Sequence, residues 1–173
     1  GWELKSLKKQ RFLSPLKGSP EWDEIDKSYP ELHKSYESGL DNSTQRQVHK
    51  MFKKDQQKAM GALFRIGDKA QENYALNRFA PHSEQQLNEL LKIIETSGYP
   101  GERLIGNDYW ASTILSHHNS ITKDYAMQDT LYTQMKPLLL EAIRAGAMSP
   151  YEYALADDWY IAVSSDRKGA GYG

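Results

Sequence analysis

Apolar residues recur every three or four positions along most of this chain, and this spacing places side chains on one face of an α-helix. Residues 21–39 follow it, so we expect one or two short helices there, separated at Pro30. Residues 45–79 follow it as well and predict a long helix that Gly61 and Gly67 bend or divide. No stretch alternates regularly enough to predict a strand ladder.

Residues that cap helices mark the starts of further helices. Ser83 and Gln86 have the spacing of a capping box, in which each side chain bonds the backbone N–H of the other residue. Ser149 and Glu152 have the same spacing, with Pro150 at the first helical position. We therefore expect helices to begin at both serines.

Two more helices are expected between these capping boxes. One begins near Asn107, after a glycine-rich loop. The other begins at Thr122 or Asp124, is kinked at Pro137 and ends at Gly146.

These segments predict an all-α fold, with a single domain over residues 21–173 built as an irregular bundle of about six helices. Residues 1–20 are expected to form a basic N-terminal arm that ends in helix-breaking residues. Its cations are Lys5, Lys8, Lys9, Arg11 and Lys17. We interpret the arm as a solvated or wrapping segment, with contact to an anionic surface as the alternative.

Composition narrows the classes of partner. The chain of 173 residues is 39% hydrophobic and has a formal net charge of −1, so its bulk charge does not predict nucleic-acid binding. Apolar runs such as Leu138 to Leu140 are far short of the ~20 residues that span a bilayer, so no membrane span is expected. The protein is then soluble, either cytoplasmic or exported with its leader removed, and composition leaves its oligomeric state open.

Several kinds of chemistry have no sequence support. There is no cysteine, no Walker loop, no dinucleotide fingerprint, no HExxH and no GxSxG, so no cofactor is expected. Adjacent positions on a helix differ by about 100° in direction, so His117 and His118 are not expected to chelate one metal ion. The remaining histidines lack ligand spacing, and no metal site is expected.

Three ionisable residues stand where the helical pattern calls for an apolar side chain, and they are Asp55, His118 and Asp158. Asp55 shares its face with Val48, Phe52, Ala59 and Ile66, His118 with Ala111, Ile114 and Leu115, and Asp158 with Tyr151, Ala154, Leu155 and Ala162. Their neighbours His117 and Asp157 also have inward-facing registers, so either member of each doublet can be the inward one.

Burying an unpaired ionisable group costs several kcal/mol, so we expect these side chains to pair with one another or with a ligand. Pairing of His118 with Asp158 or Asp55 would fix the tautomer of the imidazole and free its other nitrogen for proton transfer. The same pairing is also consistent with a purely structural polar cluster.

The order of several short motifs resembles the bacterial DUF6624 family of uncharacterised proteins. The motifs are Asp55-Gln56, Gly98-x-Pro100-Gly101, Leu104-Ile105-Gly106, the run Ile114 to His118, Gly146-x-Met148-Ser149, Ala154-x-x-x-Asp158 and Tyr172-Gly173. By position, the resemblance matches His118 and Asp158 to the histidine and aspartate of the family pattern. Trp159 and Ala170 stand where that pattern has arginine and glutamine.

Three functions follow from this reading. The first is a pocket for a small polar ligand, built from His118, Asp158 and Asp55. Residues expected to contribute to binding are Gln56, His117, Asp157, Arg167 and Tyr172. The second is a hydrolase-like enzyme with His118 as general acid and base. The third is a structural or protein-interaction domain that presents Trp2, Trp22 and Tyr29.

Overall fold

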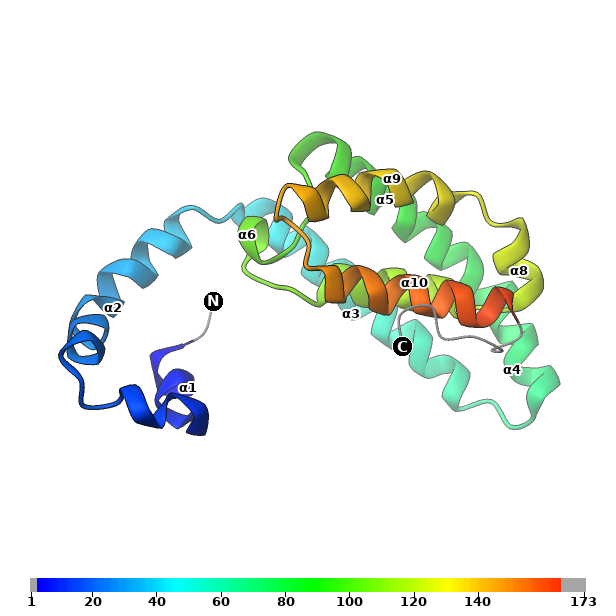
Figure 1. Ribbon diagram of the computed structural model, residues 1–173. Helices are drawn as coiled ribbons and strands as arrows, with labels where there is room; N and C mark the ends of the chain where they lie inside the picture. Colours follow the sequence, from blue (N-terminus) through cyan, green and yellow to red (C-terminus); the bar gives the residue numbers. More distant parts are fainter. Residues whose placement is uncertain (1–2, 166–173) are drawn as a thin grey trace. The chain divides into compact units, whose positions relative to one another are not determined.

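The computed structural model describes residues 3–165, and within that range the protein contains ten α-helices and no β-strand (Figure 1). The all-α prediction is confirmed. The helices are more numerous than the expected six, because loops divide several of the predicted segments and short helices occupy others.

The chain divides into two compact units, Gly1–Leu40 and Asp41–Gly173. The sequence had placed the boundary at residue 20. The described part of the first unit contains α1 (Leu4–Lys9), a 3-10 turn (Arg11–Leu16) and α2 (Pro20–Ser38). An ion pair of 2.6 Å between Lys8 and Asp26 joins α1 to α2, so α2 belongs with the basic segment.

Helix α2 runs through Pro30 without a break. Among residues 3–40 no side chain is fully buried, so this unit has no hydrophobic core of its own. Trp22 is half-buried and the ring of Tyr29 stacks on His33, while Trp2 lies outside the described residues.

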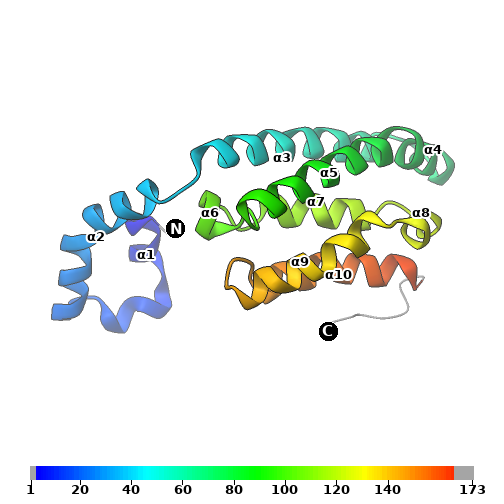
Figure 2. The same cartoon turned by 90° about the horizontal axis from the view of Figure 1, so that it is seen from above.

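The second unit contains the remaining helices. They are α3 (Asn42–Leu63), α4 (Asp68–Tyr74), a π turn (Ala75–Phe79), α5 (Ala80–Ser97), α6 (Glu102–Ile105), α7 (Trp110–Asn119), α8 (Lys123–Gln128), α9 (Leu131–Arg144) and α10 (Pro150–Ser164). Helix α7 is central, because it packs against α3, α5 and α10 (Figures 1 and 2). Its buried residues Ile114 and Leu115 join one core with residues such as Leu87 and Leu139.

The expected long helix over 45–79 is divided after Leu63. The turn that follows contains Gly67, whose φ of 91° is accessible to glycine and strained for other residues. Ile66 lies in this turn and is 97% exposed, so its predicted inward position was wrong.

Helix α4 continues through the π turn into α5 without an intervening loop. The π turn lies just before Pro81, which has no N–H to donate and whose ring would clash with the carbonyl four residues earlier in an α-helix. The wider turn relieves that clash, and such turns are frequent at functional sites.

The capping predictions had mixed outcomes. Ser149 and Glu152 form a complete capping box at the start of α10. Ser83 does not cap α5, because that helix begins three residues earlier, at Ala80, where Pro81 is tolerated in its first turn. The helix expected from Thr122 to Gly146 is interrupted at Asp129, which instead caps α9.

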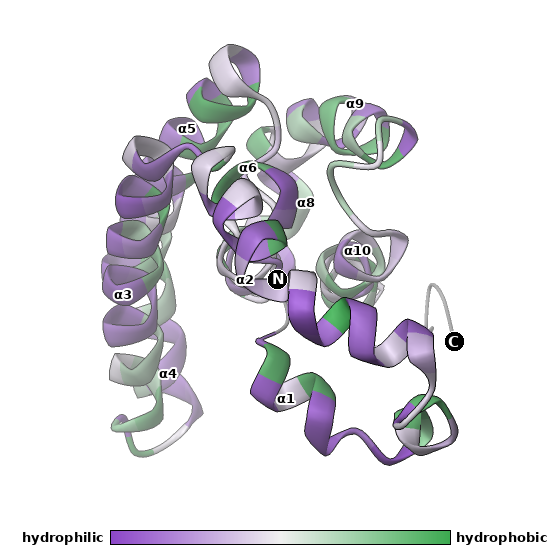
Figure 3. Cartoon of the chain, turned by 90° about the vertical axis from the view of Figure 1, so that its left-hand side faces the viewer, coloured by the Kyte–Doolittle hydropathy of each residue, from purple (hydrophilic) through white to green (hydrophobic). Residues whose placement is uncertain are grey.

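The helices of the second unit differ in the hydropathy of their residues. Helix α3 is largely hydrophilic in Figure 3, whereas α9 has longer hydrophobic stretches. Within residues 3–165, no helix combines the length and apolarity needed to cross a membrane.

Candidate functional site

The two adjacent histidines near the end of α7 have different partners. Asp55 on α3 and His118 on α7 are both buried, as their registers predict, but they do not pair with each other. Asp55 binds His117 instead, with 2.5 Å between Oδ2 and the ring Nδ1. His118 is paired with Ser83 and Asp129.

The His117–Asp55 pair joins a fully buried carboxylate to a half-exposed imidazole. The Asp55 side chain is 0% exposed and that of His117 is 30% exposed. Because an ionised carboxylate only accepts hydrogen bonds, Nδ1 carries a proton in this pair, and in the neutral form of the imidazole Nε2 is an acceptor. The Nε2 atom has no hydrogen-bond partner among residues 3–165.

Two neighbours complete the surroundings of this pair. Gln56 Nε2 lies 3.5 Å from Asp55 Oδ2, and the ring of Phe79 meets His117 edge-on at 6.4 Å between centroids. The second carboxylate oxygen of Asp55, Oδ1, is buried and has no partner within the described part of the chain. Gln56, expected as a binding residue, thus lies against Asp55.

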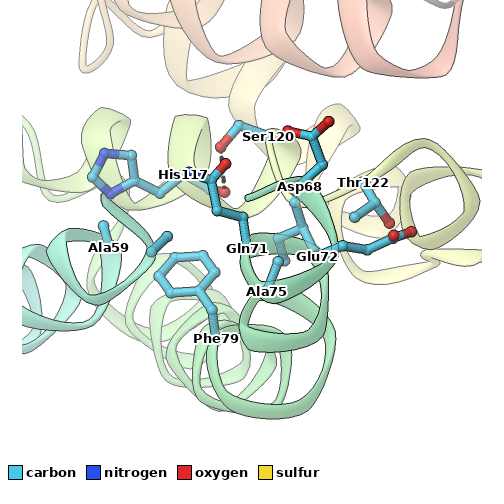
Figure 4. A pocket seen from close by; sticks show the side chains of 11 residues that line it. Ala59, Asp68, Gln71, Glu72, Ala75, Phe79, His117, Ser120 and Thr122 are labelled. Atoms are coloured by element: carbon cyan, nitrogen blue, oxygen red, sulfur yellow. Dashed lines mark hydrogen bonds between the residues drawn. The ribbon is translucent and has the colours of Figure 1, made fainter. Parts of the chain in front are cut away.

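A cavity of about 400 Å³ lies beside His117 and is bounded by α3, α4, the π turn and the end of α7. Its walls are Ala59, Ala62, Asp68, Gln71, Glu72, Ala75, Phe79, His117, Ser120, Ile121 and Thr122. In Figure 4, His117 lies at one side of the cavity and Glu72 and Thr122 lie at the other. A volume of this size accommodates a small molecule.

The polar groups of the cavity are mainly hydrogen-bond acceptors. Asp68 and Glu72 are one turn apart on α4, and no lysine or arginine is among the described residues of the cavity wall. Ser120 Oγ donates to the carbonyl of His117, and Thr122 Oγ1 accepts the backbone N–H of Tyr125. These features favour a ligand that is neutral or positively charged and that carries N–H or O–H groups.

His118 belongs to a second, enclosed polar cluster. Ser83 Oγ lies 2.9 Å from its Nδ1, and Asp129 Oδ2 lies 3.2 Å from its Nε2, an ion-pair distance outside hydrogen-bond geometry. The ring of Tyr125 covers the imidazole edge-on at 5.5 Å between centroids. Ser83 is 0% exposed, is bonded to His118 and is not among the residues that line the cavity beside His117, so a substrate in that cavity does not reach its hydroxyl.

Asp129 shows why this cluster is stable. Burial acts to raise the pKa of Asp129, but the imidazole of His118 and the backbone N–H groups of Leu131 and Tyr132 outweigh it, so the pKa lies below its usual value. The carboxylate caps α9 and holds His118 at once. We therefore interpret the cluster around His118 as structural.

The inward member of the aspartate doublet on α10 is Asp157. Its Oδ1 accepts the hydroxyl of Tyr132 at 2.9 Å and lies 2.7 Å from Lys136 Nζ. Asp158 is half-buried, and its Oδ1 is enclosed without a partner among residues 3–165. The predicted pairing of His118 with Asp158 or Asp55 is corrected to pairing with Asp129.

The error at Asp158 has a physical cause. Helix α10 has apolar residues on all sides, so periodicity does not determine which face is buried. Tyr151 and Leu155, on the expected inward face, are 72% and 41% exposed, whereas Tyr153 and Ala156 are buried.

Two of the expected binding residues are not described by the structure, and one residue of the His118 cluster was not expected from the sequence. Arg167 and Tyr172 lie outside the described residues. Within residues 3–165 there is no group of three or more histidine, cysteine, aspartate or glutamate side chains that could hold a metal ion. Asp129 was missed because its segment was read as one continuous helix, although an aspartate two positions before Leu131 is a capping signal.

No protein-family model, curated protein or solved structure matches this chain. The resemblance to the DUF6624 family therefore stays a prediction, and the function is argued from geometry.

Proposed function

We propose that the cavity beside His117 binds a small polar molecule and that His117 Nε2 accepts a hydrogen bond or a proton from it. The observation that carries this proposal is the pairing of a half-exposed imidazole with a fully buried carboxylate at the cavity wall. Asp55 fixes the tautomer and orientation of the ring, which leaves the other ring nitrogen as the group available to a ligand.

The cost of this arrangement supports a functional role. A carboxylate with no exposed surface and one unpartnered oxygen loses hydration that the imidazole and the long contact with Gln56 replace only in part. An apolar residue at position 55 would fit the inward face of α3 beside Val48 and Met51 at no such cost. Groups that pack poorly are frequent at functional sites.

The ligand that fits best carries amine or hydroxyl groups. Asp68 and Glu72 offer carboxylate acceptors, while Phe79 and the alanines of the wall offer apolar surface. A carboxylate or phosphate ligand would meet repulsion from both acids.

A second candidate is a hydrolase-like enzyme that uses the same pair. The His117–Asp55 pair has the composition of a general base with its orienting carboxylate, and His117 would take a proton from a water molecule. The hydroxyls of Ser120 and Thr122 already bond the backbone, so water is the nucleophile we favour.

The test uses His117→Asn, because the asparagine amide can donate to Asp55 as Nδ1 does but offers nothing in place of Nε2. Wild type and variant are screened by ¹H–¹⁵N NMR against a set of small amines, alcohols and carboxylates. We expect amines and alcohols to shift signals of residues 59–75 and 117–122 in the wild type and to lose at least about tenfold in affinity in the variant.

His33→Asn, on α2 and outside the cavity, is the matched control and should bind as the wild type does. The proposal fails if the compounds bind His117→Asn as well as the wild type, or if carboxylates bind best.

A further inference from the structure

A second groove lies between α3 and α5, with walls different from those of the His117 cavity. Its volume is about 480 Å³. Helix α3 contributes Lys50, Lys54 and Lys58, and α5 contributes His82, Gln86 and Glu89. The groove is therefore lined with basic and amide side chains.

The lysines form a regular row. They are spaced four residues apart, so all three lie along one face of α3, the helix that is largely hydrophilic in Figure 3. None of their ammonium groups forms an ion pair with a residue of the described chain. Glu89 is the one acidic side chain among the described groove residues, so three cations against one anion leave an excess of two positive charges.

Gln86 provides a second and independent observation. It is 4% exposed, and its Nε2 donates to the carbonyl of Met51 at 2.7 Å. That bond fixes which end of the amide faces α3, because a carbonyl oxygen could not donate to Met51. The amide oxygen Oε1 is left buried without a partner within residues 3–165, and a buried acceptor in this state favours a donor from a ligand.

His82 adds a second buried polar atom. Its Nε2 is buried and has no partner among the described residues. Burial lowers the pKa of His82, partly opposed by the negative charge of Asp55, so the imidazole is neutral near pH 7. A neutral imidazole has one donor and one acceptor nitrogen, so His82 Nε2 takes either role according to the tautomer. The floor of the groove therefore offers Gln86 Oε1 as an acceptor beside a cationic rim of Lys50, Lys54 and Lys58.

We propose that this groove binds a small phosphorylated molecule that carries hydroxyl or amine groups near its phosphate. The phosphate lies against Lys50, Lys54 and Lys58, which act as point charges. A hydroxyl or amine donates to Gln86 Oε1, the atom that lacks a donor. Inorganic phosphate as a dianion has few protons to donate. It can therefore pair with the lysine ammonium groups but leaves Gln86 Oε1 without a donor.

The proposal is independent of the function proposed for the His117 cavity. The residues that line the two sites are different, so each site can be changed without replacing a lining residue of the other.

The test is a ¹H–¹⁵N NMR titration of the whole chain at constant ionic strength with three probes: ribose 5-phosphate, inorganic phosphate and ribose. We expect signals of α3 and α5 around the groove to shift with ribose 5-phosphate, at a Kd about tenfold below that for inorganic phosphate. Ribose alone should bind more weakly than either.

Lys54→Gln should weaken both phosphate probes about tenfold. Lys53→Gln is the matched control, because Lys53 is an exposed neighbour on α3 that points away from the groove. Gln86→Met should remove the preference for ribose 5-phosphate over inorganic phosphate, and circular dichroism checks that this variant is folded.

Three outcomes overturn the proposal. They are no binding of ribose 5-phosphate, equal effects of Lys53→Gln and Lys54→Gln, or equal affinity for the two phosphate probes in the wild type. Either of the last two would indicate a solvated basic face that attracts anions without a built site.

Discussion

At the scale of single residues, burial separates two histidines that the sequence makes nearly equivalent. His118 is 1% exposed and lies between a serine and an aspartate, while the neighbouring His117 reaches a cavity. The difference follows from the 100° step between adjacent helix positions, which directs one ring between α5 and α9 and the other toward α3. Replacing each histidine should therefore have a different effect on the stability of the protein.

Replacing His118 should destabilise the protein. We expect His118→Ala to lower the free energy of unfolding by about 3 kcal/mol, because it leaves Asp129 without its imidazole, Ser83 without its partner and a cavity in the core. His117→Asn should lower it by no more than about 1 kcal/mol, since the bond to Asp55 is retained. Urea unfolding near pH 7 measures both, and equal losses would contradict the structural role of His118.

The contribution of Asp129 should depend on pH. Its pKa in the folded protein lies below its usual value, so its stabilisation is present above the unfolded pKa of about 3.9 and is lost as pH falls toward the folded pKa. Asp129→Asn keeps a capping side chain, so its deficit relative to wild type should shrink below about pH 4. Unfolding curves at a series of pH values show this, with the exposed Asp124→Asn as control. If the deficit of Asp129→Asn were unchanged at pH 3, roughly one unit below the unfolded pKa of aspartate, the charge of Asp129 would not be the source of the stabilisation.

At the scale of helices, the start of α10 was predictable and its inward face was not. The box at Ser149 formed where a proline also occupies the first helical position, whereas the Ser83–Gln86 pair has the same spacing but lies inside α5, so the spacing alone does not determine a helix start. The buried face of α10 depends on which helices pack against it, because apolar residues surround it.

Glu152 combines its capping role with burial. Burial is the main cause that raises the pKa of Glu152, so its folded pKa is above the unfolded one and its stabilisation is lost as pH rises through the folded pKa. Glu152→Gln keeps the box and removes the charge, so near pH 7 we expect no loss beyond about 0.5 kcal/mol, against about 1 kcal/mol for Glu152→Ala. Thermal or urea unfolding of both variants is the measurement, and similar losses would show that the charge is needed.

The contact between α3 and α4 relies on the absence of a side chain at Gly61. A Cβ there would lie 2.1 Å from the hydroxyl oxygen of Tyr74, which donates to the carbonyl of Lys58. Gly61→Ala should therefore destabilise the wild type, although alanine is worth about 1 kcal/mol more than glycine in a helix. In a Tyr74→Ala background the same change should stabilise by about that amount. Urea unfolding of the wild type, the two single variants and the double variant measures the coupling between the two positions. Additive changes in the free energy of unfolding would contradict the clash.

At the scale of the whole molecule, periodicity predicted the all-α fold and the inward positions of Asp55 and His118. It did not predict their partners, because those depend on helix packing across the core: Asp55 meets His117 from another helix, and His118 meets Asp129 in a loop read as helix. The division at Leu40 was also missed, because the pattern of α2 is amphipathic although no described side chain of that unit is fully buried.

The π turn at Ala75–Phe79 has a consequence for how this chain tolerates changes in length. Five residues of a π turn cover about the rotation of four α-helical residues, so the turn takes up one extra residue without altering the faces of α4 and α5. Deleting the exposed Asn77 would then remove the widening and keep both helices in phase. The change would fall on Ala75 and Phe79 in the cavity wall, so we expect this one-residue deletion to reshape the site and to leave the core around α7 unchanged.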